Sequence, residues 1–187
     1  MLLQKLNRLL RTTTRKARSF ARRPRFEQLW FLPAWLLLGL SRSLILFCPF
    51  RTLAPHLGRH TGTAPWIPLA DVRHEACAHA IARVVAMAAN HTPWESNCFP
   101  QAVTARVLLG LYGIPYCLFF GVNREPGDTS MQAHAWVAAG KIRVTGGGSF
   151  GQYTVVSCFA SPGLIGIDKN ALLSPNSASE KSVTESL

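Results

Sequence analysis

The hydrophobic pattern begins with a long apolar stretch at residues 29–50, LWFLPAWLLLGLSRSLILFCPF. Pro33 and Arg42 interrupt it, and an arginine near the centre of a membrane span costs about 2.5–3.5 kcal/mol on insertion scales. We therefore expect a helix or helical hairpin that packs on the rest of the protein. A helix that spans a membrane or lies at its interface is the less favoured alternative.

Apolar residues then recur every three to four positions over residues 69–90, which predicts a second helix with Asp71 in its first turn. The polar sequence HTPWESN ends this pattern. Residues 51–68, between the two apolar regions, are rich in Pro, Gly, Thr and His and are typical of a connector.

A third helix is predicted from Asn97 to Tyr112. Asn97 or Ser96 is a suitable cap, and Gly113, with a proline shortly after it, is a suitable end. One apolar stripe along this helix is expected to face the core: Phe99, Val103, Val107 and Leu111.

After this helix the period changes to that of strands. Four segments rich in aromatic and β-branched residues are separated by turns that contain glycine: 115–122, 133–139, 141–145 and 153–159. Helices followed by antiparallel strands predict an α+β fold.

The net charge of +11 comes mainly from one part of the chain. Residues 1–26 hold nine Lys and Arg residues and no acidic residue, whereas the remainder is nearly neutral. Such a basic arm with leucines at helical spacing is able to bind an acidic surface, but no nucleic-acid-binding motif accompanies it. We divide the chain into this arm, an apolar helical segment and connector (27–68), a main domain (69–171) and a disordered tail (172–187).

The five cysteines are odd in number, and neither a CxxC pair nor zinc-ligand spacing occurs among them. This favours free thiols in a reducing compartment such as the cytoplasm, with no metal or other cofactor. Most of them are expected to be small buried hydrophobic residues: Cys48, Cys77, Cys117 and Cys158.

Cys98 is the exception, because it lies in the first turn of a predicted helix. Free backbone N–H groups and the helix dipole favour a thiolate there and would stabilise an oxyanion during acyl transfer. A histidine is suited to deprotonate the thiol and to protonate the leaving amine. His134, on a predicted strand, is the candidate base; a structural role for both residues is the alternative.

The sequence around these two residues resembles the B proteins of lasso-peptide biosynthesis, which are transglutaminase-like leader peptidases. The signature is a Cys that opens a helix, a Leu-rich helix that ends in Gly-Ile-Pro, a strand that ends in Gly-Val, and Ala-His-Ala-Trp, within residues 90–160. Residues 27–58 also look like the N-terminal helical part of the stand-alone members.

The resemblance implies a papain-like cysteine protease that removes the leader from a ribosomally made precursor peptide, with Cys98 as nucleophile and His134 as base. It also implies a separate small leader-recognition protein and an ATP-dependent cyclase as partners. Association with a membrane through residues 1–50 remains an alternative to a purely cytoplasmic location.

The chain departs from the family at the third catalytic position. The family has an Asp about a dozen residues after the His, but position 146 here is Gly. Thr145, Gln152 or a residue from a distant loop is left to orient the imidazole. Since loss of the orienting acid costs up to ~10⁴ in a serine-protease triad, a catalytically impaired scaffold of the same fold is the alternative function.

Overall fold

The protein is described by a computed structural model in which residues 18–63, 71–124, 130–148 and 151–162 are placed. The helices are α2 (Arg25–Phe47), α3 (Phe50–Leu57), α4 (Val72–Ala89) and α5 (Cys98–Leu111). The strands are β1 (Arg59–Gly62), β2 (Cys117–Asn123), β3 (Gln132–Ala139), β4 (Ile142–Thr145) and β5 (Thr154–Ala160). The α+β fold and the four predicted strands are confirmed.

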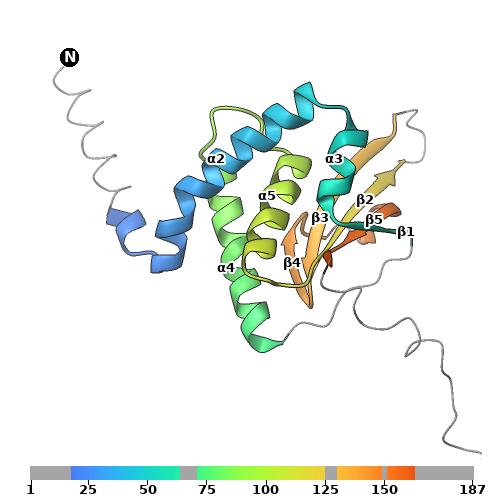
Figure 1. Ribbon diagram of the computed structural model, residues 1–187. Coiled ribbons are helices and arrows are strands. Elements are labelled where there is room, and N and C mark those ends of the chain that lie inside the picture. Colours follow the sequence, from blue (N-terminus) through green and yellow to red (C-terminus); the bar gives the residue numbers. More distant parts are fainter. Residues whose placement is uncertain (1–17, 64–70, 125–129, 149–150, 163–187) are drawn as a thin grey trace, which may run out of the picture.

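The strands form one antiparallel sheet in the order β1-β5-β2-β3-β4. Helices α4 and α5 lie against one face of it, and α2 crosses over these two helices (Figure 1). The main core lies between the helices and the sheet, where alternate strand residues such as Leu118, Val137 and Val144 meet Ile81, Leu108 and other helix residues.

The opposite face of the sheet carries a second cluster of buried residues: Cys117, Phe119, Trp136, Ala138, Cys158 and Ala160. Because successive side chains on a strand point to opposite faces, β3 contributes Val137 to the first core and Trp136 to the second. The sheet is therefore buried on both faces.

Helix α2 packs on the domain, as the sequence predicted, and is a single helix that includes Pro33. Its buried residues are Glu27, Ala34, Leu38 and Ser41. Glu27 accepts a hydrogen bond from Arg83 Nε of α4 at 2.6 Å, and this bond, with a second one from Arg23, holds the pKa of its carboxyl below the usual 4.5. An ion pair thus joins α2 to α4.

The expectation of a connector over residues 51–68 is wrong for its first part. Residues 50–57 form α3 and residues 59–62 form β1, which pairs with β5. The sequence of β1, RHTG, has no alternation of apolar and polar residues that would predict a strand. Its extended conformation depends on its pairing with β5. Residues 64–70 lie outside the described part of the chain, as do the predicted tail and most of the basic arm.

Helix α5 begins at Cys98 and ends before Gly113, whose φ of 63° suits glycine. The predicted core stripe on this helix is only partly right, because Phe99 and Val103 pack against the core but Leu111 does not. Its last member, Leu111, is exposed, and the other three are only half buried. The side that faces α4 and the sheet instead carries Ala102, Ala105, Leu108 and Leu109.

Candidate active site

The turn before α5 sets the position of Cys98. Thr92 Oγ1 lies 2.9 Å from both Trp94 O and Ser96 Oγ, and Gln101 Nε2 donates to Ser96 O at 2.6 Å. Asn97 is the cap residue by position, although its side chain makes no capping hydrogen bond. The polar residues of this turn therefore fix the backbone immediately ahead of Cys98.

Cys98 is the first residue of the helix and is half buried against the core between helices and sheet. The first backbone N–H groups of a helix have no partner within it, so those of Cys98 and Phe99 are candidate oxyanion donors. The third residue, Pro100, has no N–H to contribute. A negative charge on a substrate oxygen is favoured at this helix end.

His134 lies on β3 among aromatic side chains. Its imidazole stacks on Tyr153 with a centroid distance of 4.9 Å and an interplanar angle of 27°. Trp136 lies on the same side of the strand, with its ring 6.0 Å away. The ring is therefore held between large flat neighbours and is only partly open to water.

Gly121 makes this stack possible. It is the residue of β2 that pairs with His134, and a Cβ at this position would lie 2.6 Å from Trp136 Cη2 and 2.9 Å from Tyr153 Cβ. Real Cβ atoms do not come so close to other atoms. Any side chain at 121 would separate the rings that enclose the imidazole.

The backbone of Gly146 hydrogen-bonds to the His134 ring. This bond favours the protonated ring, so we assign the ring N–H as donor and the Gly146 carbonyl as acceptor. Thr145, the residue proposed from the sequence to orient the ring, uses its hydroxyl to accept from Val137 N at 3.1 Å. Gln152, the other named candidate, is exposed.

Burial lowers the pKa of His134 below its ordinary value of 6.5, and the Gly146 hydrogen bond opposes this only in part. Desolvation penalises the charged imidazolium more than the neutral ring. At neutral pH the ring is therefore in the neutral form that accepts a proton, which is the state a general base requires.

The structure places Cys98 and His134 on neighbouring elements, since α5 packs on β3 (Figure 1), but does not join them. Cys98 packs against the core that contains Ala135 and Val137, whereas alternation along β3 puts His134 on the side of Trp136. Burial and Gly146 account for the shifted pKa of His134, with no contribution from the Cys98 thiol. Cys98 and His134 therefore lie on opposite sides of β3, and their action as a catalytic pair stays a prediction.

Two of the four remaining cysteines are less buried than the sequence suggested. Cys117 and Cys158 are fully buried, as expected, and their thiols are hydrogen-bonded; this bond and burial raise the pKa of Cys117, so it stays protonated. Cys48 and Cys77 are only half buried, like Cys98, because they lie at helix surfaces.

Within the placed segments, no group of three or more His, Cys, Asp or Glu is suited to hold a metal ion.

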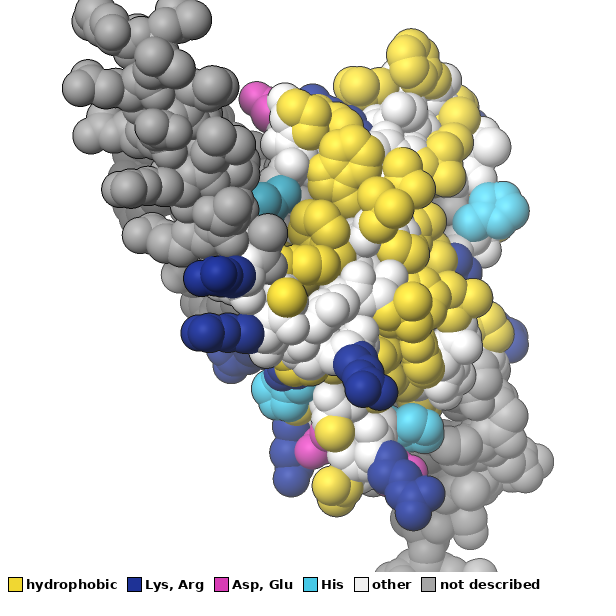
Figure 2. Space-filling view, turned by 90° about the vertical axis from the view of Figure 1, so that its left-hand side faces the viewer, with side chains coloured by type: hydrophobic (Ala, Val, Ile, Leu, Met, Phe, Trp, Pro, Cys, Tyr) yellow, Lys and Arg dark blue, Asp and Glu magenta, His cyan; other side chains and the backbone are white. Residues whose placement is uncertain are grey.

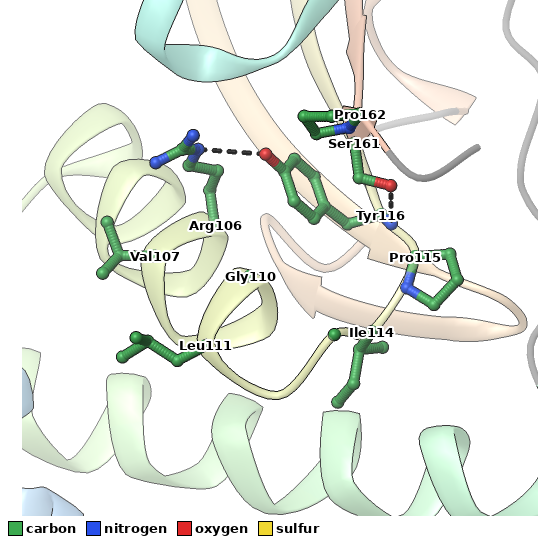
Figure 3. A pocket seen from close by; sticks show the side chains of 10 residues that line it. Arg106, Val107, Gly110, Leu111, Ile114, Pro115, Tyr116, Ser161 and Pro162 are labelled. Carbon is green, nitrogen blue, oxygen red and sulfur yellow. Dashed lines mark hydrogen bonds between the residues drawn. The ribbon is translucent and has the colours of Figure 1, made fainter. Parts of the chain in front are cut away.

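A cavity of about 500 Å³ lies at the other end of α5, away from Cys98 (Figure 3). Arg106 Nε donates to Tyr116 Oη at 2.9 Å, and Tyr116 Oη donates to Leu57 O at 3.1 Å. Burial raises the pKa of Tyr116, although the adjacent Arg106 opposes the shift. Neither Cys98 nor His134 lines this cavity, so it is separate from the candidate active site.

The fold and the position of Cys98 define a class: an α+β domain with a cysteine at the start of a helix that packs on an antiparallel sheet. The model of the transglutaminase-like superfamily matches residues 44–158, and the chain belongs to this superfamily, which includes cysteine proteases. Searches of curated proteins and of solved structures gave no match. The match begins within α2, so α3 and β1 belong to the matched region.

Sequence reasoning did not find Gly121, Tyr153 or the backbone of Gly146. Gly121 carried one available signal, because a glycine inside an aromatic strand often marks a close approach of other groups. The role of Gly146 has no side-chain signal, since the group involved is a backbone atom.

Proposed function

We propose that the protein is a cysteine protease that removes the leader from a lasso-peptide precursor, with Cys98 as nucleophile and His134 as general base. The observation that carries the proposal is Cys98 as first residue of α5, a helix that packs on the strand of His134, in a chain of the transglutaminase-like superfamily. The lasso-specific part rests on the Cys-to-His-Ala-Trp sequence signature.

The proposed reaction has two steps. His134 takes the thiol proton, the Cys98 sulfur attacks the carbonyl carbon of the scissile peptide bond, and first-turn N–H groups of α5 stabilise the oxyanion. The proton passes to the leaving amine, which is the new N-terminus of the core peptide. Water then hydrolyses the thioester and restores the thiol.

The partners follow from this reaction. The substrate is a precursor peptide, which a separate small leader-recognition protein would present, and an ATP-dependent cyclase would use the freed amine to close a macrolactam. All of these steps belong in the cytoplasm, where the free thiols stay reduced.

The test is to incubate the purified chain with precursor and recognition protein and to detect leader release by mass spectrometry. Cys98→Ala and His134→Ala are expected to abolish release. Cys77→Ala is the matched control, because this thiol is also half buried but lies within α4. Release by Cys98→Ala at the wild-type rate would overturn the proposal.

A second candidate function is a non-catalytic scaffold that binds the precursor, the recognition protein or the cyclase. It is favoured by Gly at position 146 and by the position of His134 on the side of β3 that carries Trp136, away from the core that Cys98 contacts. Iodoacetamide labelling distinguishes the two: a catalytic Cys98 reacts faster at neutral pH than the half-buried Cys48 and Cys77. Equal labelling of all three thiols, with precursor binding but no cleavage, would establish the scaffold.

A further inference from the structure

Helix α2 (Arg25–Phe47) exposes an apolar face to solvent. Its buried residues Ala34, Leu38 and Ser41 lie on one side. The opposite side carries exposed leucines at helical spacing, which we call the leucine face: Leu29, Leu32, Leu36 and Leu40. A surface helix of a globular protein normally presents polar residues there.

The exposed apolar surface continues past the leucine face. Leu46 and Phe47 at the end of α2 and Phe50 at the start of α3 are also exposed. Figure 2 shows hydrophobic side chains gathered in a continuous band on one side of the molecule, with Lys and Arg at its margins. Apolar patches of this extent, rimmed by polar residues, mark interaction surfaces.

Exposed arginines flank the leucine face at both of its ends, while the exposed Glu95 pairs with Arg42 of α2. Arg18, Arg22 and Arg25 are exposed at its N-terminal end and Arg51 is exposed beyond its C-terminal end. The only acidic residue in the sequence of α2 is Glu27, which is buried on the opposite side and paired with Arg83. A surface that is apolar in the middle and basic at both ends complements anionic lipid, whose head groups attract arginine and whose acyl chains accept leucine.

By length and composition α2 is able to cross a membrane, but its contacts favour a position parallel to the surface. Glu27 bonds Arg83, Trp30 Nε1 donates to Tyr112 Oη at 2.6 Å, and Trp35 Nε1 donates to His91 O at 3.1 Å. These bonds hold one whole side of α2 on α4, α5 and the turn between them. A spanning orientation would break them or carry charged groups into hydrocarbon.

We propose that the leucine face of α2 docks the protein on an anionic lipid bilayer, with α2 in the plane of the interface and the flanking arginines at the head groups. This proposal does not depend on the proposed protease function. It assigns a role to a helix that the candidate active site does not use.

The test is flotation of the full chain with vesicles of phosphatidylcholine alone or mixed with phosphatidylglycerol. The wild type is expected to float with the anionic vesicles and much less with the neutral ones. The double variant Leu36→Gln/Leu40→Gln removes two exposed leucines (56% and 55% exposed) and should bind at least about tenfold more weakly. The control variant Val72→Gln/Met131→Gln changes two residues that lie outside the leucine face and are 82% and 68% exposed. It should bind like the wild type.

Circular dichroism of each variant confirms that folding is unchanged, as expected for exposed positions. Failure of the wild type to float with anionic vesicles overturns the proposal, and so does equal flotation of both double variants. A wild-type oligomer that Leu36→Gln/Leu40→Gln disperses, without lipid binding, would instead identify the face as a protein interface. Retention of the protein in cell membranes after alkaline carbonate extraction would show a spanning helix and overturn the in-plane orientation.

Discussion

His134 is hydrogen-bonded to the backbone of Gly146, twelve residues further along the chain. The superfamily members that the sequence resembles place an aspartate at about this distance. Residue 146 therefore contacts the His134 ring in this protein as well, but it does so through a neutral backbone carbonyl and not through a carboxylate side chain. A carbonyl fixes the ring orientation and gives less stabilisation to an imidazolium than a full negative charge does.

Gly146→Asp is expected to increase leader release by at least about tenfold, because it supplies the missing negative charge beside His134. The φ of Gly146 is 82°, a conformation that Asp tolerates better than most residues. The rate of release by mass spectrometry and the His134 pKa by NMR titration measure the effect, and both should rise. Gly147→Asp, at a φ of 54°, is the control with the same strain and a displaced carboxylate. Equal gains in both variants would contradict a specific role for position 146.

The pH dependence of the wild type follows from the lowered pKa of His134. The neutral ring is the base, so activity is lost as pH falls and His134 takes up a proton. Because burial holds its pKa below 6.5, the midpoint of the acidic limb of kcat/KM should lie below pH 6.5. NMR titration of the ring provides an independent value. A midpoint above 6.5 that agrees with the NMR titration would contradict the assigned environment.

Gly121→Ala is expected to destabilise the fold by about 1–3 kcal/mol, because the new Cβ would overlap the rings of Trp136 and Tyr153. Unfolding in urea measures the change. Gly110→Ala is the control: no atom lies within 4 Å of its added Cβ, and its helical backbone should make the substitution neutral or stabilising by about 0.4–1 kcal/mol. Similar losses in both variants would show that the aromatic stack is not the cause.

Glu27→Gln is expected to lower the free energy of unfolding by about 1–3 kcal/mol at neutral pH, since it removes the charge from the acceptor of two hydrogen bonds, one from Arg83 of α4 and one from Arg23. The carboxyl pKa is below 4.5 in the folded state, so this contribution is complete above pH 4.5 and disappears as pH falls through the folded-state value. The two proteins should therefore converge in acid. Glu95→Gln removes an exposed pair with Arg42 and should change stability by less than about 1 kcal/mol at any pH. A constant difference between Glu27→Gln and wild type down to strongly acidic pH would exclude the ion pair as its source.

The sequence predicted those parts of the fold that local patterns specify. The four aromatic and β-branched strands and the helix that starts at Cys98 were predicted because each carries its own periodicity and boundary residues. β1 was missed because pairing with β5, not its own sequence, makes it a strand. The buried side of α5 was predicted only in part, because large apolar residues mark the stripe in the sequence, whereas close packing against α4 and the sheet selects the small Ala102 and Ala105.

Only those parts of the candidate site that depend on residue type were predictable from the sequence. Cys98 and His134 were named from residue type and position, and they remain predictions as catalytic residues. The hydrogen bond that the Gly146 carbonyl accepts from the His134 ring has no signal in residue type, because any residue carries the same carbonyl. The enclosure of His134 by Tyr153 depends on how β2 and β5 pair, which a one-dimensional pattern does not give.

β1 has a practical consequence for the design of shortened forms of the protein. It covers the outer edge of β5 by pairing with it, so a fragment that begins after residue 62 would leave the backbone of β5 without its partner. An uncovered edge strand recruits strands from other molecules and leads to aggregation. The N-terminal third therefore shields the sheet from self-association, and a truncated fragment that lacks it is expected to aggregate through the open edge of β5.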